Sequence, residues 1–387
     1  MSEYQHYEWQ TIDRLLTEAE QEAVRRLSSH IEVSSSRAAV TYSWGDFKHD
    51  PRDVLVKFFD AHLYMANWGS RRLMFRFPTG LLIREAIELY CVDDLIIFKP
   101  MNGFNVLDIE VHEEEGCWVD CEGSLSSLLP LRDEILQGDY RTLYLAWLKA
   151  MSLRGDGPPR GRKSIASKPP EPPIPPGLNH LSPALERFME QFDVPSCLVA
   201  AAAEISPELA DGPETDFRPL VAQLTREECD GFLYRVVQDD PSATLELKKR
   251  LRSFVPCQPA APTVRRSIRE LLKRAEAIED ERNRRKKEET RKKHVAEMET
   301  LAAHEEEIWR QAESLIEMKR SKQYDAAVQQ LGKLKDLADF RQTQATFRRR
   351  VEALCEQYRR LSGLKYRVAA AKLLLDEPVE HGQEDDS

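Results

Sequence analysis

The chain has 387 residues, of which 41% are hydrophobic and 32% charged, and its formal net charge is −10. This length favours two or three folded units over one small core. No apolar run approaches the roughly 18 residues that a membrane-spanning helix needs, and the first ten residues lack the features of a signal peptide. We therefore expect a cytoplasmic protein, and these observations argue against membrane-embedded and secreted functions.

Charge is distributed unevenly along the chain. Residues 1–261 contain 28 Lys and Arg against 41 Asp and Glu, a net charge of −13. Residues 262–370 contain 27 against 19, a net charge of +8, and residues 371–387 contain 1 against 6, a net charge of −5. Such asymmetry is typical of a protein that interacts with other molecules or whose own segments attract each other.

Residues 1–152 predict one α+β domain. Alternating and β-branched patterns predict strands at 7–12, 38–44 and 72–77. Two further strands, 94–100 and 104–111, are expected to form a hairpin, because Asn102-Gly103 between them is a strong turn signal.

Four helices are expected in the same domain. The helix at 16–29 has Thr17 or Thr11 as its cap, and a longer helix at 49–69 begins with Asp50 and Pro51 and ends at Gly69. The segments 125–136 and 140–151 predict the two helices that close the domain.

A metal site could be drawn from side chains near the end of the hairpin. These are Asp108, Glu110, His112, Cys117 and Cys121. A strand at 117–122 with an odd loop length before it would put both cysteines on the face opposite the acids, and the spacing is not a paired CxxC set. We therefore expect no metal and no other cofactor.

Residues 153–177 are rich in Pro, Gly and basic residues and predict a linker. Within it, Arg160, Arg162 and Lys163 resemble the core of an AT-hook, which inserts Arg side chains into a narrow minor groove. The usual motif has proline where Lys163 stands, so an ordinary basic linker is the alternative reading.

The rest of the chain predicts helices. Residues 178–256 suggest a small helical domain, 263–320 a long charged helix, 321–370 a helical hairpin, and 371–387 a disordered acidic tail. A heptad seam runs through the start of the long helix and predicts a short, broken coiled coil. Its members are Val264, Ile268, Leu271, Ala275 and Ile278.

The segment 281–294 contains eight cations in fourteen residues. They are Arg282, Arg284, Arg285, Lys286, Lys287, Arg291, Lys292 and Lys293. Three acid-first pairs at i, i+4 spacing would stabilise a solvated helix: Glu281–Arg285, Glu288–Lys292 and Glu289–Lys293. The alternative is sequence-independent contact with nucleic-acid phosphates, although no aromatic residue in the segment can stack on a base.

The turn at 67–72 is the strongest candidate for a recognition surface in the α+β domain. It offers Trp68, Arg71 and Arg72, and Trp and Arg are common binding hot spots. The alternative is a buried Trp beside two surface arginines. The sequence has no phosphate-binding glycine loop, GxSxG or HExxH motif, and we expect no enzymatic activity.

Several segments resemble an uncharacterised family of bacterial cytoplasmic proteins over nearly the whole chain. They are YEWQTIDRLLT, YSWGDF, FFDAHLYMANWGSRRLMFRFP, LLPLRDEILQGDYRTLYLAWL and KQYDAAVQQLGKLKDLADFRQ. The resemblance implies no activity. Residues 305–370 are also similar to helical tails of bacterial SWIM zinc-finger proteins, but the CxC and CxH ligands are absent, so zinc-dependent DNA binding is not implied.

The sequence thus predicts an α+β domain followed by an all-α region. The main hypothesis is a non-enzymatic interaction or scaffold protein of the bacterial cytoplasm, which binds unidentified protein partners and pairs with them, or with its own copy, through the coiled coil. The alternative is an accessory factor that contacts DNA or RNA through the basic helix and the linker. An enzyme is the least supported class.

Overall fold

The computed structural model describes residues 4–113, 124–154, 171–209, 217–238, 240, 243–252, 254 and 266–374. The chain divides into two compact units, Met1–Asp280 (unit 1) and Glu281–Ser387 (unit 2). Unit 1 contains an antiparallel sheet and helices, and the described part of unit 2 is helical. The predicted fold class, an α+β domain followed by an all-α region, is confirmed.

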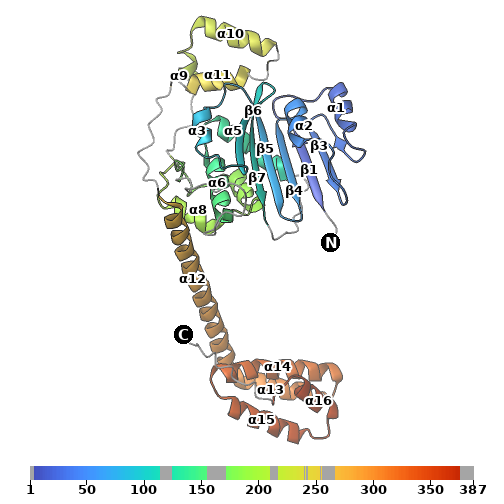
Figure 1. The fold of residues 1–387 in the computed structure, drawn as a ribbon. Helices are drawn as coiled ribbons and strands as arrows, with labels where there is room; N and C mark the ends of the chain where they lie inside the picture. Colours follow the sequence, from blue (N-terminus) through green and yellow to red (C-terminus); the bar gives the residue numbers. More distant parts are fainter. Residues whose placement is uncertain are drawn as a thin grey trace. The chain divides into compact units, whose positions relative to one another are not determined.

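Unit 1 is built on a seven-stranded antiparallel sheet with the strand order β2-β3-β1-β4-β5-β7-β6 (Figure 1). The strands are β1 (Gln5–Gln10), β2 (Glu32–Val33), β3 (Arg37–Tyr42), β4 (Ala61–Ala66), β5 (Ser70–Pro78), β6 (Ile96–Met101) and β7 (Phe104–His112). The predicted hairpin is confirmed, because Met101 pairs with Phe104 across Asn102 and Gly103, which both have positive φ.

Helices cover both faces of the sheet. Tyr7, Trp9 and Met74 point to the face that packs against α1 (Glu18–Arg25) and α2 (Pro51–Phe58). Leu63, Phe75 and other residues point to the opposite face, where the larger core lies and where Figure 1 shows α5 and α6. The alternate residues Leu107, Ile109 and Val111 of β7 are buried in this larger core.

The prediction of one helix over 49–69 is wrong beyond Phe58. Asp50 caps α2 and Pro51 occupies its first turn as expected, but residues 61–66 form the central strand β4. The strand alternates, with Leu63 and Met65 in the larger core and His62 on the other face. Pairing with both neighbours overrides the helix propensity of its Ala, Leu and Met residues.

The larger core is closed by a layer of helices. They are α3 (Arg84–Glu88), α4 (Ser124–Leu128), α5 (Pro130–Leu136), α6 (Arg141–Arg154), α7 (Pro183–Gln191) and α8 (Ser196–Ala203). Helix α6 is buried on most of its surface, and Leu185 and Phe188 of α7 join the same cluster as the sheet. Residues 184–203 therefore complete the core of unit 1 instead of forming the separate helical domain predicted at 178–256.

The linker prediction is wrong for residues 171–177. Glu171 and Ile174 are buried, and the Tyr90 hydroxyl donates to Pro173 O at 2.7 Å. Gly177 has a φ of +79°, and a Cβ there would lie 2.4 Å from Leu209 Cδ1, so the end of this segment requires glycine. Proline-rich sequence is thus packed into the core, because proline loses little entropy on burial.

Three further helices follow in unit 1. They are α9 (Phe217–Val221), α10 (Arg226–Val237) and α11 (Ala243–Arg252). Ion pairs of Arg235 with Glu246 and of Arg250 with Glu228 join α10 to α11. Arg160, Arg162 and Lys163 lie outside the described residues, as does the strand expected at 117–122.

The apolar heptad positions at the start of the long helix, which predicted a short coiled coil, pack in the core of unit 1. Helix α12 (Ile268–Ala303) begins in unit 1, where Ile268, Leu271 and Ala275 are buried in the larger core. Arg266, just before the helix, donates to Glu171 at 3.1 and 3.2 Å and to Ala201 O at 2.9 Å. This stretch of the seam therefore packs within its own unit.

Unit 2 has its own apolar core. Helix α12 ends at Ala303, and α13 (Glu305–Glu317), α14 (Ser321–Phe340), α15 (Gln344–Gln357) and α16 (Ser362–Ala370) follow. Trp309 of α13 lies at the centre and is covered by Phe347 and by the Arg350 guanidinium, 4.3 Å from its ring. The long helix predicted over 263–320 is thus interrupted at His304.

Candidate interaction surfaces

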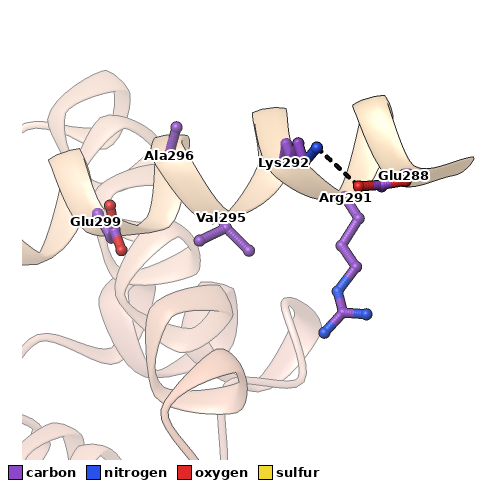
Figure 2. Close-up of a pocket in the computed structure, with 6 residues that line it drawn as sticks. All are labelled: Glu288, Arg291, Lys292, Val295, Ala296 and Glu299. Atoms are coloured by element: carbon purple, nitrogen blue, oxygen red, sulfur yellow. Dashed lines mark ion pairs between the residues drawn. The ribbon is translucent and has the colours of Figure 1, made fainter. Parts of the chain in front are cut away.

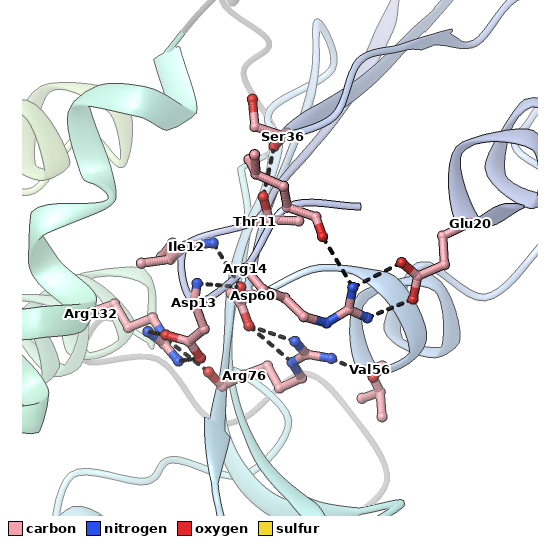
Figure 3. Close-up of polar contacts among 11 residues, drawn as sticks. Thr11, Ile12, Asp13, Arg14, Glu20, Ser36, Val56, Asp60, Arg76 and Arg132 are labelled. Atoms are coloured by element: carbon pink, nitrogen blue, oxygen red, sulfur yellow. Dashed lines mark hydrogen bonds and ion pairs between the residues drawn. The ribbon is translucent and has the colours of Figure 1, made fainter. Parts of the chain in front are cut away.

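The buried charges of unit 1 form a structural network (Figure 3). Asp60 accepts hydrogen bonds from the backbone of Ile12 and Asp13 and from Arg76 Nη2 at 2.6 Å. Arg132 is fully buried and donates to both carboxylate oxygens of Asp13, at 2.9 and 2.7 Å. Its Nε donates to Arg76 O at 2.9 Å. Because these guanidinium groups donate through all their nitrogens to the protein itself, they fix the segment after β1 and are not offered to a ligand.

A second buried acid, Glu8, lies on β1 under helix α4. Arg37 Nε and Gln10 Nε2 donate to its Oε1 at 2.7 and 2.9 Å, and His6 Nε2 lies 3.8 Å from Oε2. Burial opposes the ionised form, but these contacts outweigh it and lower the pKa of Glu8 to about 2. Glu8 is therefore a carboxylate at neutral pH and stabilises the sheet.

His62 lies on the opposite face of the sheet, in an aromatic stack. Its ring centroid is 4.6 Å from that of Trp9, and its Nδ1 donates to Glu8 O at 3.0 Å. Complete burial lowers its pKa to about 3, so the ring is neutral. Its buried Nε2 has no hydrogen-bond partner among the described residues.

The three candidates of the 67–72 turn have different environments. Trp68 is 40% exposed, whereas Arg71 is only 6% exposed and pairs with Glu113 at 3.2 Å. Arg72 is half-buried and donates to both oxygens of Asp108, at 2.7 and 2.6 Å. The prediction that Arg71 belongs to a surface is therefore wrong, because the alternation of β5 turns it into the core. The carboxylate of Asp108, one of the candidate metal ligands, forms ion pairs with Arg72 and Arg52.

A second exposed tryptophan, Trp44, was missed by the sequence reasoning. It is 75% exposed on the loop that follows β3. Gln5 Nε2 holds this loop by donating to Gly45 O at 3.0 Å and to Asp46 Oδ1 at 2.8 Å. The hydroxyls of Tyr7 and Tyr64 both donate to Gln5 Oε1, which fixes the amide. The sequence feature that could have indicated an exposed turn here is Gly45. Its φ of +77° permits the tight turn after Trp44.

Trp44 and Trp68 lie at the same end of the sheet. Gln5 pairs with Tyr42 on one side and with Ala66 on the other, and each tryptophan follows two residues later. The two loops are therefore separated by two strand spacings, about 10 Å. The second loop approaches the backbone of Glu113 so closely that position 69 requires glycine, because a Cβ there would lie 2.5 Å from Glu113 O. We call Trp44 and Trp68 the tryptophan rim.

The basic segment of α12 is confirmed as an exposed helix. All eight candidate cations, from Arg282 to Lys293, are exposed. The three predicted ion pairs are present: Arg285–Glu281 at 2.5 Å, Lys292–Glu288 at 2.7 Å and Lys293–Glu289 at 3.1 Å. These acids neutralise part of the basic charge and leave other cations facing solvent.

A shallow hollow lies beside this basic segment, with a volume of about 390 Å³ (Figure 2). It is lined by Glu288, Arg291, Lys292, Val295, Ala296 and Glu299. Figure 2 shows Lys292 turned toward Glu288, whereas Arg291 and Val295 project to another side of the helix. A cation and an apolar side chain therefore share this hollow.

In the parts of the chain that the structure describes, no cluster of His, Cys, Asp and Glu could hold a metal ion. No helix in these parts is both long and apolar enough to cross a membrane. No family model, curated protein or solved structure matches the chain. The resemblance to a bacterial family and to the SWIM-associated tails therefore stays a prediction.

Proposed function

We propose that this chain is a non-enzymatic interaction protein whose unit 1 binds a partner protein through the tryptophan rim. The observation that carries the proposal is the exposure of Trp44 and Trp68 at one end of the sheet, on loops held by hydrogen bonds from Gln5 and by the close approach of Gly69 to Glu113. Tryptophan is a frequent hot-spot residue, and a rigid loop loses little entropy when a partner binds.

The surroundings of the rim indicate the chemistry of the partner. Asp46 is exposed beside Trp44, and Glu110 lies half-buried near Arg72. Residues 1–280 contain 33 Lys and Arg against 45 Asp and Glu, a net charge of −12. A partner surface with an apolar centre and cations at its edge would complement this region.

The test uses paired alanine variants. Trp44→Ala and Trp68→Ala should each remove the same partner from an affinity purification of the bacterial lysate, after nuclease treatment. Ile83→Ala, which removes another exposed apolar side chain of unit 1, is the matched control. The purified partner should then bind wild type, with a loss of about 2 kcal/mol or more for each Trp variant in calorimetry. A partner that binds all variants equally would refute the rim as the binding surface.

A second candidate function, sequence-independent contact with nucleic acid, is favoured by the cations of α12 that face solvent. Arg284, Lys287 and Arg291 form no ion pair of 4.0 Å or less with the described residues and could meet phosphates. Retention of a labelled single-stranded oligonucleotide should fall steeply with salt and be abolished when Arg284 and Lys287 are both changed to Glu. Unchanged retention would exclude this candidate.

A further inference from the structure

One side of the basic helix carries a line of cations. Arg284, Lys287 and Arg291 are spaced i, i+3 and i+7, so they lie on the same side of α12. All three are exposed, and none has an ion-pair partner within the described residues. Arg285, Lys292 and Lys293 are already paired with glutamates of the same helix. We call Arg284, Lys287 and Arg291 the basic stripe.

The basic stripe leads into the hollow beside Val295. Val295 follows Arg291 by four residues, and both side chains project to the same side in Figure 2. The neighbouring His294 ring contacts Phe340 of α14 edge-on, at 6.0 Å between centroids, so this end of the stripe borders the core helices of unit 2. A ligand that carries several acidic side chains and one or two apolar side chains would match the stripe and the hollow together.

The chain contains such a segment at 375–387, with the sequence LDEPVEHGQEDDS. It has six Asp and Glu and no Lys or Arg, and Leu375 and Val379 stand among the first acids. The residues just before it are fixed in unit 2, because Leu373 is buried in its core and Lys335 Nζ donates to Lys372 O at 3.2 Å. The segment thus starts from the same compact unit that contains the stripe.

The segment is long enough to reach the stripe. Leu301 of α12 packs against the core cluster that contains Leu373, and Arg284 lies 17 residues earlier on the same helix, about 26 Å along its axis. An extended chain of 13 residues spans up to about 45 Å. Attachment to the same unit also gives the acids an effective concentration of the order of mM near the cations.

We propose that residues 375–387 bind along the basic stripe of the same chain, with carboxylates at Arg284, Lys287 and Arg291 and an apolar side chain in the hollow beside Val295. Exposed ion pairs are individually weak and are screened by salt. The contact is therefore reversible, and it competes with any other polyanion that approaches the stripe. This inference does not depend on the tryptophan rim.

Carbodiimide cross-linking of the full chain tests the proposal, because it joins a lysine amine directly to a carboxylate in contact with it. Lys287 should be joined to acids of 376–386 at low salt, and the yield should fall about fivefold or more in 1 M NaCl. Lys286 is the matched control, since it is the neighbouring exposed cation and lies on another side of the helix. Mixing isotope-labelled and unlabelled chains separates links within one chain from links between chains. Equal yields at Lys286 and Lys287, or links only between chains, would overturn the proposal.

A competition experiment gives a second readout. A chain that ends at Leu374 should bind a single-stranded oligonucleotide about fivefold or more tightly than the full chain at about 0.1 M salt. Lys287→Glu in the shortened chain should remove this gain, whereas Lys286→Glu should not. Shortening without any gain would count against the competition. If neither chain binds the oligonucleotide, the nucleic-acid function fails, and the cross-links still decide whether the segment occupies the stripe.

Discussion

Charged side chains have opposite surroundings in the two units. In unit 1, Asp60, Arg76 and Arg132 are buried and bonded to partners far away in the sequence. On residues 281–293 of α12, the cations and acids are exposed, and the three ion pairs found there join neighbours one turn away. The same residue types therefore hold the fold of unit 1 together and are exposed on the basic segment of α12.

The largest loss of stability is expected from a substitution in the buried network of Asp60, Arg76 and Arg132. Asp60→Ala would leave Arg76 buried without its carboxylate, and removing one partner of a buried pair costs about 3–5 kcal/mol. We expect the free energy of unfolding of unit 1 to fall by this amount in urea, monitored by tryptophan fluorescence. Asp94→Ala, an exposed acid of the same unit, is the control and should change little. A loss below about 1 kcal/mol for Asp60→Ala would mean that the network is dispensable.

The contrast also explains what the sequence could predict. The three ion pairs of α12, the helix cap at Thr17 and the Asn102-Gly103 turn depend on residues within four positions of each other, and all are confirmed. Arg132 and Asp13 are separated by 119 residues, so no local pattern indicates their pairing.

Tertiary packing also explains the errors. The segment 61–66 has good helix formers but is paired on both sides in the sheet, and Pro172 and Pro175 of the predicted linker are buried. Of the predicted recognition surface, Trp68 is exposed and Arg71 is buried, because strand alternation decides which side chains face the core. Trp44 was missed because its exposure depends on a loop that Gln5 holds from another strand.

A smaller loss of stability is expected when Glu8 is substituted, and its size depends on pH. Its pKa is about 2 in the folded chain and about 4.5 when unfolded, so the unfolded state binds more protons between these values. The stabilisation is complete above about pH 4.5 and is lost as the pH falls toward 2. Glu8→Gln should therefore reduce stability by up to about 3 kcal/mol at pH 7, and the difference from wild type should shrink in acid. The same loss at pH 7 and pH 3 would show that the charge of Glu8 is not responsible.

His62 should make stability depend on pH in a higher range than Glu8 does. Its pKa is about 3 in the fold and about 6.5 when unfolded, so the unfolded state gains a proton first as the pH falls below 6.5. Stability should drop by about 2 kcal/mol between pH 6.5 and pH 5 through this group alone. His62→Phe should flatten that drop, whereas the exposed control His180→Gln should keep it. An unchanged slope in His62→Phe would mean that another group causes the acid sensitivity.

The smallest effect is expected on α12, where breaking an ion pair should leave the fold almost unchanged. Glu289→Gln removes the partner of Lys293, but both side chains are exposed and the pair is screened by salt. The melting temperature should change by less than about 1 °C. Glu289 lies on the side of α12 opposite the basic stripe, so the chain that ends at Leu374 should bind an oligonucleotide with nearly unchanged affinity. A large loss of stability would show that the helix depends on these pairs, and its cations would then be structural like those of unit 1.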